Sequence, residues 1–216
     1  PKDAVRELRL VEPEALAGAA DAPAVITAVW AALRVDSDEE AMDLLLGSER
    51  VIEDIRAACF HGLPTPRLVA RRWEHAMDPC LEFRLFVHGA ALTAACSYHA
   101  GCLVPALRRH HSAVAAQLRR FWAEAIRPRV PSDCEDYTVD VVLVRADGEG
   151  GDAAGAAELA RVVEVNHPPP VASTILFDWD NAADRRLLVS GPFELRLVDG
   201  HTEPRRLVQR LLGSGA

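Results

Sequence analysis

The chain has 216 residues, half of them hydrophobic, which is enough for one sizeable core or one two-lobed domain. No stretch approaches the roughly 20 consecutive apolar residues of a membrane helix, and the start is neither a secretory signal nor a transit peptide, so we expect no membrane association. The net charge is −8 with acidic and basic residues interspersed, which argues against a dedicated nucleic-acid binder.

The first part of the chain combines an apolar run with a helical pattern. Residues 24–35 are rich in β-branched side chains, which predicts a buried strand ending near Arg34. Asp36, Ser37 and Asp38 then offer N-caps for a helix that continues through residues 41–55. Pro64 and Pro66 mark a loop.

The remaining elements are short strands around one long helix. Strands are predicted at residues 67–73 and 82–87, and a turn at His88 and Gly89 leads into a strand at 91–97. Apolar residues recur with helical spacing from 104 to 126, which predicts one amphipathic helix. Further strands are expected at 137–144, 161–165 and 193–198, with a Gly- and Ala-rich insertion at 146–160 and a short helix at the end. The predicted fold class is therefore α+β with antiparallel strands dominating the second half.

The cysteines favour a reducing compartment. There are five, an odd number, without a CxxC pair, which fits a cytoplasmic protein better than a disulfide framework. Cys96, His99 and Cys102 could be imagined as zinc ligands, but their spacing matches no usual pattern and no fourth ligand is evident. Ordinary packing of these three side chains is the preferred interpretation. Separately, we expect the protein to be a monomer.

Two predicted strands carry polar side chains within apolar runs. Glu164 and Asn166 are two residues apart on one strand, so they point to the same face. If the neighbouring strand is antiparallel, its Asp140 lies beside them and three oxygen ligands share one surface. Mg²⁺ takes one or two carboxylates together with phosphate oxygens and water, so these residues are candidate ligands of a nucleotide-bound magnesium ion. The alternative is an ordinary solvent face of an amphipathic strand.

Several basic residues are candidate phosphate ligands. Arg34, Arg71, Arg72 and Arg84 occupy predicted strand positions, and guanidinium groups bind phosphate oxygens bidentately. Taken singly, each is more often a surface ion-pair partner. Lys2 is the only lysine in an arginine-rich chain, which suggests either a chemical role or chance. Neither GxGxxG nor GxxxxGK occurs, so phosphates would be held by side chains and ordinary backbone.

A series of short motifs runs in order along nearly the whole chain. They are PKDA at residues 1–4, ALRV at 32–35 with LLLGS at 44–48, LVARRW at 68–73, EFRLFV at 82–87, YTVDVV at 137–142, VEVNHP at 163–168, ILFDW at 175–179 and FELR at 193–196. Each is weak alone. In this order the series resembles the cell division cycle protein 123 family, an ATP-grasp group.

The resemblance implies an ATP-grasp-like, two-lobed domain with antiparallel sheets that binds ATP and Mg²⁺. Residues 1–66 would belong to the small lobe, residues 67–198 to the large lobe, and residues 199–216 to a C-terminal helix and tail. Basic residues of the small lobe would contact the phosphates, the segment 68–72 would meet adenine, and an arginine of the large lobe would reach the phosphates. The implied ATP-binding residues are Lys2, Arg34, Val69, Ala70, Arg71, Arg72, Arg84, Asp140, Glu164 and Asn166, of which the last three are the implied metal ligands.

The chain departs from the family pattern in several places. Glu164 replaces the usual aspartate, but Glu-x-Asn is the version seen in ATP-grasp enzymes generally, so metal binding should be preserved. The family's upstream segment is absent, which suggests an incomplete small lobe. A tyrosine-rich stretch of the family is SYHAGC here, at residues 97–102, and this puts any partner or substrate contact there in doubt.

The function implied by the resemblance is that of an ATP-dependent assembly chaperone. Such a protein binds the gamma subunit of eukaryotic translation initiation factor 2 and promotes assembly of that heterotrimer. One alternative is a catalytic ATP-grasp ligase that joins a carboxylate to an amine or thiol through an acyl phosphate, which the Glu-x-Asn pair favours. Another is a degenerate module, or one domain of a longer protein, that binds nucleotide weakly or not at all.

Overall fold

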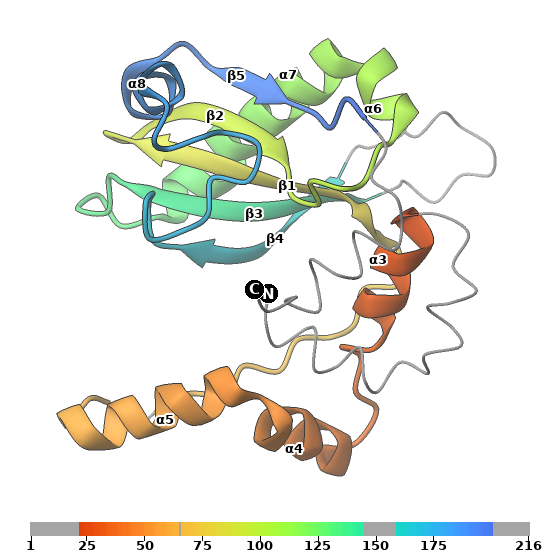
Figure 1. Cartoon of the computed structure of the whole chain (residues 1–216), viewed down its shortest axis with the longest axis vertical. Coiled ribbons are helices and arrows are strands. Elements are labelled where there is room, and N and C mark those ends of the chain that lie inside the picture. Colours follow the sequence, from red (N-terminus) through yellow and green to blue (C-terminus); the bar gives the residue numbers. More distant parts are fainter. Residues whose placement is uncertain (1–21, 65, 145–158, 201–216) are drawn as a thin grey trace. The chain divides into compact units, whose positions relative to one another are not determined.

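The computed structural model describes residues 22–64, 66–144 and 159–200 (Figure 1). The chain divides into two compact units, whose described parts are residues 22–75 and 76–200. In these ranges no helix has both the length and the apolar character needed to cross a membrane.

The described part of the first unit contains three helices, α3 (Ala22–Ala31), α4 (Asp38–Gly47) and α5 (Glu49–His61). The predicted cap before α4 is confirmed, because the Ser37 side chain accepts a hydrogen bond from the Glu40 amide. The predicted helix over residues 41–55 is instead divided between α4 and α5 at Ser48, whose hydroxyl caps α5 through the Val51 amide. Gly62, in the left-handed conformation with φ of 63°, ends α5.

Two predicted strands of this unit are wrong. Residues 24–35 form α3 and a turn, and the buried Val25, Ile26 and Val29 follow helical rather than alternating spacing. The β-branched side chains suggested a strand, but the alanines of this segment favour a helix. Residues 67–73 form irregular chain, with Val69 75% exposed, and the described part of this unit offers no strand for them to pair with.

The second unit is built on a five-stranded sheet in the order β4-β3-β1-β2-β5. All neighbours are antiparallel except β2 and β5, which are parallel. The strands are β1 (Met77–His88), β2 (Ala91–Ser97), β3 (Tyr137–Val144), β4 (Leu159–Asn166) and β5 (Glu194–Arg196). The strands predicted around these segments and the turn after His88 are confirmed. Gly89 and Ala90 both have positive φ, 56° and 57°, as a tight type I′ hairpin requires.

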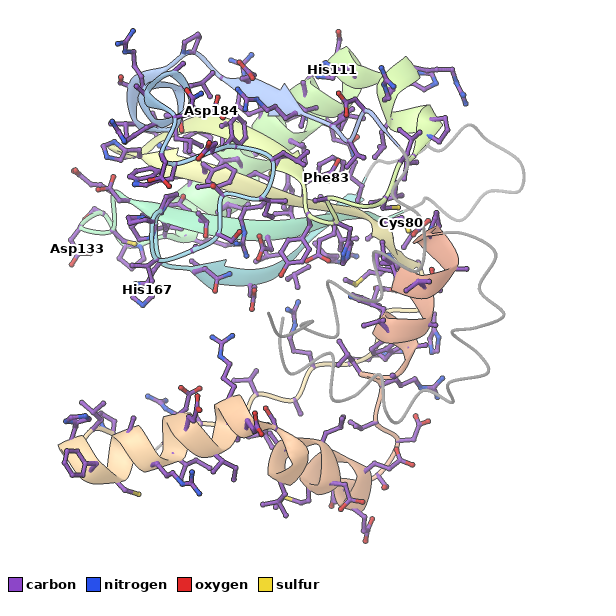
Figure 2. All side chains as sticks on the ribbon, in the orientation of Figure 1. Cys80, Phe83, His111, Asp133, His167 and Asp184 are labelled. Carbon is purple, nitrogen blue, oxygen red and sulfur yellow. The ribbon has the colours of Figure 1, made fainter. Side chains whose placement is uncertain are left out.

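Helices cover the two faces of this sheet differently. One face packs against a continuous helical path, which runs behind the strands in Figure 1 and consists of α6 (Pro105–Arg109), α7 (His111–Phe121), the π-helical turn η1 (Trp122–Ile126) and the 3₁₀ turn η2 (Arg127–Arg129). The single helix predicted over residues 104–126 is therefore interrupted. Phe83 lies in the core on this side (Figure 2), together with Leu85, Leu118, Val139 and Val141.

The opposite face packs against α8 (Ala182–Ser190), a helix that the sequence patterns missed. Its core is smaller and consists of Phe86, Ala94, Cys96, Phe177 and Leu188. All five cysteines are free thiols. The predicted insertion lies outside the described residues except for its last two positions, which begin β4, and the predicted C-terminal helix lies outside them as well.

Candidate functional site

One row of side chains crosses the whole sheet of the second unit. Arg84 of β1 lies opposite Asp140 of β3, and Asp140 lies opposite Glu164 of β4. On the other side, Arg84 is opposite Cys96 of β2, which in turn is opposite Arg196 of β5. Directly opposed residues share a face of a sheet, so all five side chains are on the face that packs against α8.

At the centre of the row is a buried ion pair. The Arg84 Nε and Nη2 atoms donate to the two Asp140 carboxylate oxygens at 2.8 and 2.7 Å. The Nη1 atom donates to the Ser173 carbonyl at 3.0 Å. The exposed fractions of the two side chains are 7% and 0%. The geometry is bidentate, the strongest form of an arginine–carboxylate contact.

Asn166 joins the two carboxylates of the predicted metal set. Its Nδ2 atom donates to Asp140 Oδ2 at 3.2 Å and to Glu164 Oε1 at 2.9 Å. The expectation that β3 and β4 are antiparallel neighbours is confirmed, and the three side chains converge on one point. A bulge after Asp140 shifts the register of the two strands, and Glu164 stays directly opposite Asp140.

Burial and charge shift the protonation equilibria of this cluster. Burial raises the pKa of Asp140 to about 6, with the hydrogen bond from Arg84 opposing the rise and that of Glu164 adding to it. Burial alone would lower the pKa of Arg84, but the hydrogen bond and charge of Asp140 outweigh it, so the pKa is raised. The Arg84 Cζ atom also lies 5.1 Å from the centre of the Tyr98 ring. Burial and the negative charge of Glu82 raise the Tyr98 pKa to about 12.

The residues present fit a magnesium ion by their chemistry. Two carboxylates and one amide are ligands of the kind that Mg²⁺ accepts in nucleotide sites. In the described ranges no group of three His, Cys, Asp or Glu side chains could hold a metal ion. The candidate set has two carboxylates, so its third protein ligand would be the Asn166 amide. This amide presents its nitrogen to the carboxylates, and a half-turn about its last side-chain bond would present the oxygen instead.

A third acidic group lies beside the two carboxylates of this cluster. Glu82 is only 5% exposed, and alternation along β1 puts it on the same face as Arg84, as the sequence predicts. The His99 Nε2 atom is 3.5 Å from Glu82 Oε2, and this buried nitrogen makes no hydrogen bond with any described residue. The sequence pointed to His99 only as a disfavoured zinc ligand and gave no sign of the Ser173 carbonyl, because both come from irregular segments that only the tertiary fold brings to the sheet.

The other predicted nucleotide ligands belong to the first unit. Arg34 pairs with Asp36, with its Nη2 atom 2.8 Å from the carboxylate. Four residues of the segment expected to meet adenine, all exposed, lie on the irregular chain after α5: Val69, Ala70, Arg71 and Arg72. Lys2 lies outside the described residues. The roles of these residues toward a nucleotide stay predictions.

Comparison with known proteins identifies relatives of the chain. The family model described as D123 matches residues 21–212. Among solved structures, Cdc123 from Schizosaccharomyces pombe matches with a TM-score of 0.56 and 20% identity, over 87% of this chain and 68% of that chain. A C-terminally truncated Cdc123 from the same organism matches with a TM-score of 0.53 and 20% identity, over 75% of this chain and 62% of that chain. No curated protein sequence matches significantly. The solved structures show a shared fold, and the predicted α+β class with mainly antiparallel strands is confirmed.

Proposed function

The chain belongs to the D123 family, as its ordered motifs predicted, and on that premise we propose that it is an ATP- and magnesium-binding assembly chaperone. Its partner would be the gamma subunit of eukaryotic translation initiation factor 2, and its role would be to promote assembly of that complex in the cytoplasm. The observation that supports nucleotide binding is the convergence of Asp140, Glu164 and Asn166 beside Arg84.

Each of these side chains has a defined part in the proposed site. Asp140, Glu164 and Asn166 would hold Mg²⁺, and the ion would neutralise part of the charge of the ATP phosphates. Arg84 uses three of its five N–H groups on Asp140 and the Ser173 carbonyl, so two remain for a phosphate oxygen. Lys2 and Arg34 would contact the phosphates and residues 69–72 would meet adenine.

Isothermal titration with ATP and MgCl₂ tests the metal assignment. Asn166→Ala should weaken magnesium-dependent ATP binding by about tenfold or more, as the loss of a charge-assisted ligand implies. Asn166 is the most informative position because it is outside the buried ion pair, so its loss leaves Arg84 and Asp140 compensated.

The matched control is Val165→Ala on the same strand. Val165 is adjacent in sequence, 56% exposed and directed to the other face of β4, so its truncation should leave ATP affinity unchanged. Equal affinity of Asn166→Ala and the wild type, or binding that persists in EDTA, would contradict the assignment.

Capture of the purified gamma subunit tests the chaperone role separately. We expect the immobilised wild-type chain to retain this subunit when ATP and magnesium are present. The immobilised Asn166→Ala variant should not retain it under the same conditions. Retention by neither protein would refute the chaperone role and leave the nucleotide site to be judged by titration alone.

A catalytic ATP-grasp ligase is the second candidate. The observation that favours it is the Glu-x-Asn pair of β4, with Glu164 directly opposite Asp140. ADP release that requires both a small carboxylate and an amine or thiol would support this activity. A chain that binds no ATP at all would instead be the degenerate module.

A further inference from the structure

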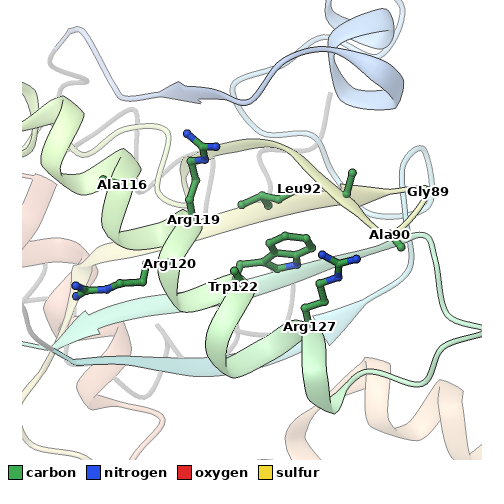
Figure 3. A pocket seen from close by; sticks show the side chains of 10 residues that line it. Gly89, Ala90, Leu92, Ala116, Arg119, Arg120, Trp122 and Arg127 are labelled. Carbon is green, nitrogen blue, oxygen red and sulfur yellow. The ribbon is translucent and has the colours of Figure 1, made fainter.

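A separate pocket of about 750 Å³ lies on the other face of the sheet in the second unit. Its walls come from α7, η1 and η2 on one side and from the β1–β2 turn with the start of β2 on the other. Figure 3 shows Leu92 and Trp122 between two arginines, Arg119 and Arg127. Because α7 packs on the face that carries Val139 and Val141, the pocket does not share side chains with the Asp140 cluster.

The helical path around this pocket is strongly basic, although the whole chain carries a net charge of −8. Residues 105–129 contain one acidic residue, Glu124, and six arginines: Arg108, Arg109, Arg119, Arg120, Arg127 and Arg129. The three of these that line the pocket are all exposed, and none has an ion-pair partner in the part of the chain that the structure describes. Arg34, Arg84 and Arg196, in contrast, are each paired with a carboxylate.

Aromatic rings hold two of the pocket arginines. The Arg127 Cζ atom lies 5.5 Å from the centre of the Trp122 ring, and the Arg119 Cζ atom lies 5.6 Å from that of Phe193. Such contacts use the flat face of a guanidinium group and leave its N–H edge available for a carboxylate. The side chains are thus partly ordered before any ligand arrives, which lowers the entropic cost of binding.

The pocket floor is fixed by a local irregularity of the helix. Trp122 begins the π-helical turn η1, is only 8% exposed, and donates from Nε1 to the Tyr137 hydroxyl at 3.1 Å. A π turn adds a residue to the helical repeat, so it changes the direction in which Arg127 leaves the helix relative to Arg119. Turns of this kind occur frequently at functional sites.

We propose that this pocket binds an acidic segment of a partner protein, with carboxylates on Arg119 and Arg127 and an apolar side chain over Leu92 and Trp122. A carboxylate accepts two parallel hydrogen bonds from a guanidinium edge. The net charge of −8 opposes a long polyanion, so a short protein segment is favoured over RNA. This inference does not depend on nucleotide binding.

Fluorescence anisotropy with a labelled peptide that repeats Glu-Glu-Leu three times tests the proposal. We expect binding that weakens with added salt, and at least about tenfold weaker binding of the Gln-Gln-Leu counterpart. The double variant Arg119→Gln/Arg127→Gln should lose about tenfold in affinity for the acidic peptide. Both positions are exposed and only the two ring contacts are lost, so the melting temperature should change little.

Arg186→Gln is the matched control, because Arg186 is an exposed helical arginine of the same unit on α8, away from this pocket. It should bind the acidic peptide as the wild type does. Equal binding of the two peptides, or full affinity in the double variant, would overturn the proposal. Tighter binding of an oligouridylate, lost in the double variant, would overturn it in favour of an RNA site.

Discussion

Two arginine–aspartate pairs, one in each unit, have nearly the same shortest N–O distance and very different surroundings. Arg84 and Asp140 of the sheet approach to 2.7 Å with side chains 7% and 0% exposed. Arg34 and Asp36 of the helical unit approach to 2.8 Å with side chains 43% and 66% exposed. The contact distance therefore carries little information about how strongly the fold depends on a pair.

Burial decides the difference between them. Two buried charges have lost their hydration, so each depends on the other, and removing one leaves an uncompensated charge in the core. Exposed charges are solvated by water whether or not they touch. Arg196 and Asp184, at 2.6 Å and with side chains 30% and 16% exposed, form an intermediate case.

The largest effect is expected at the buried pair. Arg84→Leu should lower the free energy of unfolding by about 3–5 kcal/mol, because Asp140 keeps no cationic partner. Urea denaturation measures this loss. The double variant Arg84→Leu/Asp140→Leu should recover most of it, since two apolar side chains replace two compensated charges. A single variant as stable as the wild type would show that the carboxylate is solvated or protonated at no cost.

A smaller loss is expected at the intermediate pair. Arg196→Leu removes contacts to Asp184 and Glu194 and a stacking contact with the Phe177 ring at 4.1 Å, so about 1–2 kcal/mol should be lost. Arg186→Leu on α8, which breaks no ion pair in the described chain, should change stability by less than about 0.5 kcal/mol. If the two variants lost the same free energy of unfolding in the same denaturation experiment, the Arg196 pair would not be the intermediate case.

The intermediate pair also predicts a pH dependence. The hydrogen bond from Arg196, followed by that from the Asp178 amide, lowers the pKa of Asp184 below its ordinary value of 3.8. The ionised form is thus favoured in the folded state, so the contribution to stability is complete above pH 3.8 and is lost as the pH falls below it.

Denaturation of the wild type and of Asp184→Asn from pH 7 to pH 3 measures this contribution. The difference in unfolding free energy should be constant near neutrality and should shrink at the acid end. The pH dependence of stability that Asp140 contributes has the opposite sign, because the pKa of Asp140 is raised. Its contribution to stability is present below pH 3.8 and is lost as the pH rises through about 6. A difference that grows on acidification would contradict the assignment of Asp184.

The smallest effect is expected at the exposed pair. Asp36→Asn should change the unfolding free energy by less than about 0.5 kcal/mol, since water replaces the contact and Ser37, not Asp36, caps α4. Ser37→Ala is the informative comparison, with an expected loss of about 1 kcal/mol from the missing cap. A larger loss for Asp36→Asn than for Ser37→Ala in thermal denaturation would reverse this order.

The sequence predicted the candidate site better than it predicted the first unit. Alternation along β1 and β4 put Glu82 with Arg84 and Glu164 with Asn166, and the structure has both pairs on the expected faces. Strand periodicity is a local property that survives any arrangement of neighbours. The segment at residues 67–73 shows the converse: its side chains suggested a strand, yet it is irregular, because a strand forms only where another strand pairs with it.

Sequence alone thus determined the fold class, the family, a helix cap within residues 36–38 and the strands that carry the acidic residues. It could not decide that Arg84 binds both oxygens of Asp140, that the Asn166 amide joins the two carboxylates, or that α3 is helical. These outcomes depend on strand register, on the bulge after Asp140 and on which side chains pack against one another. Register and packing are set by the whole fold, since shifting one strand by one residue would move every side chain of that strand to the opposite face.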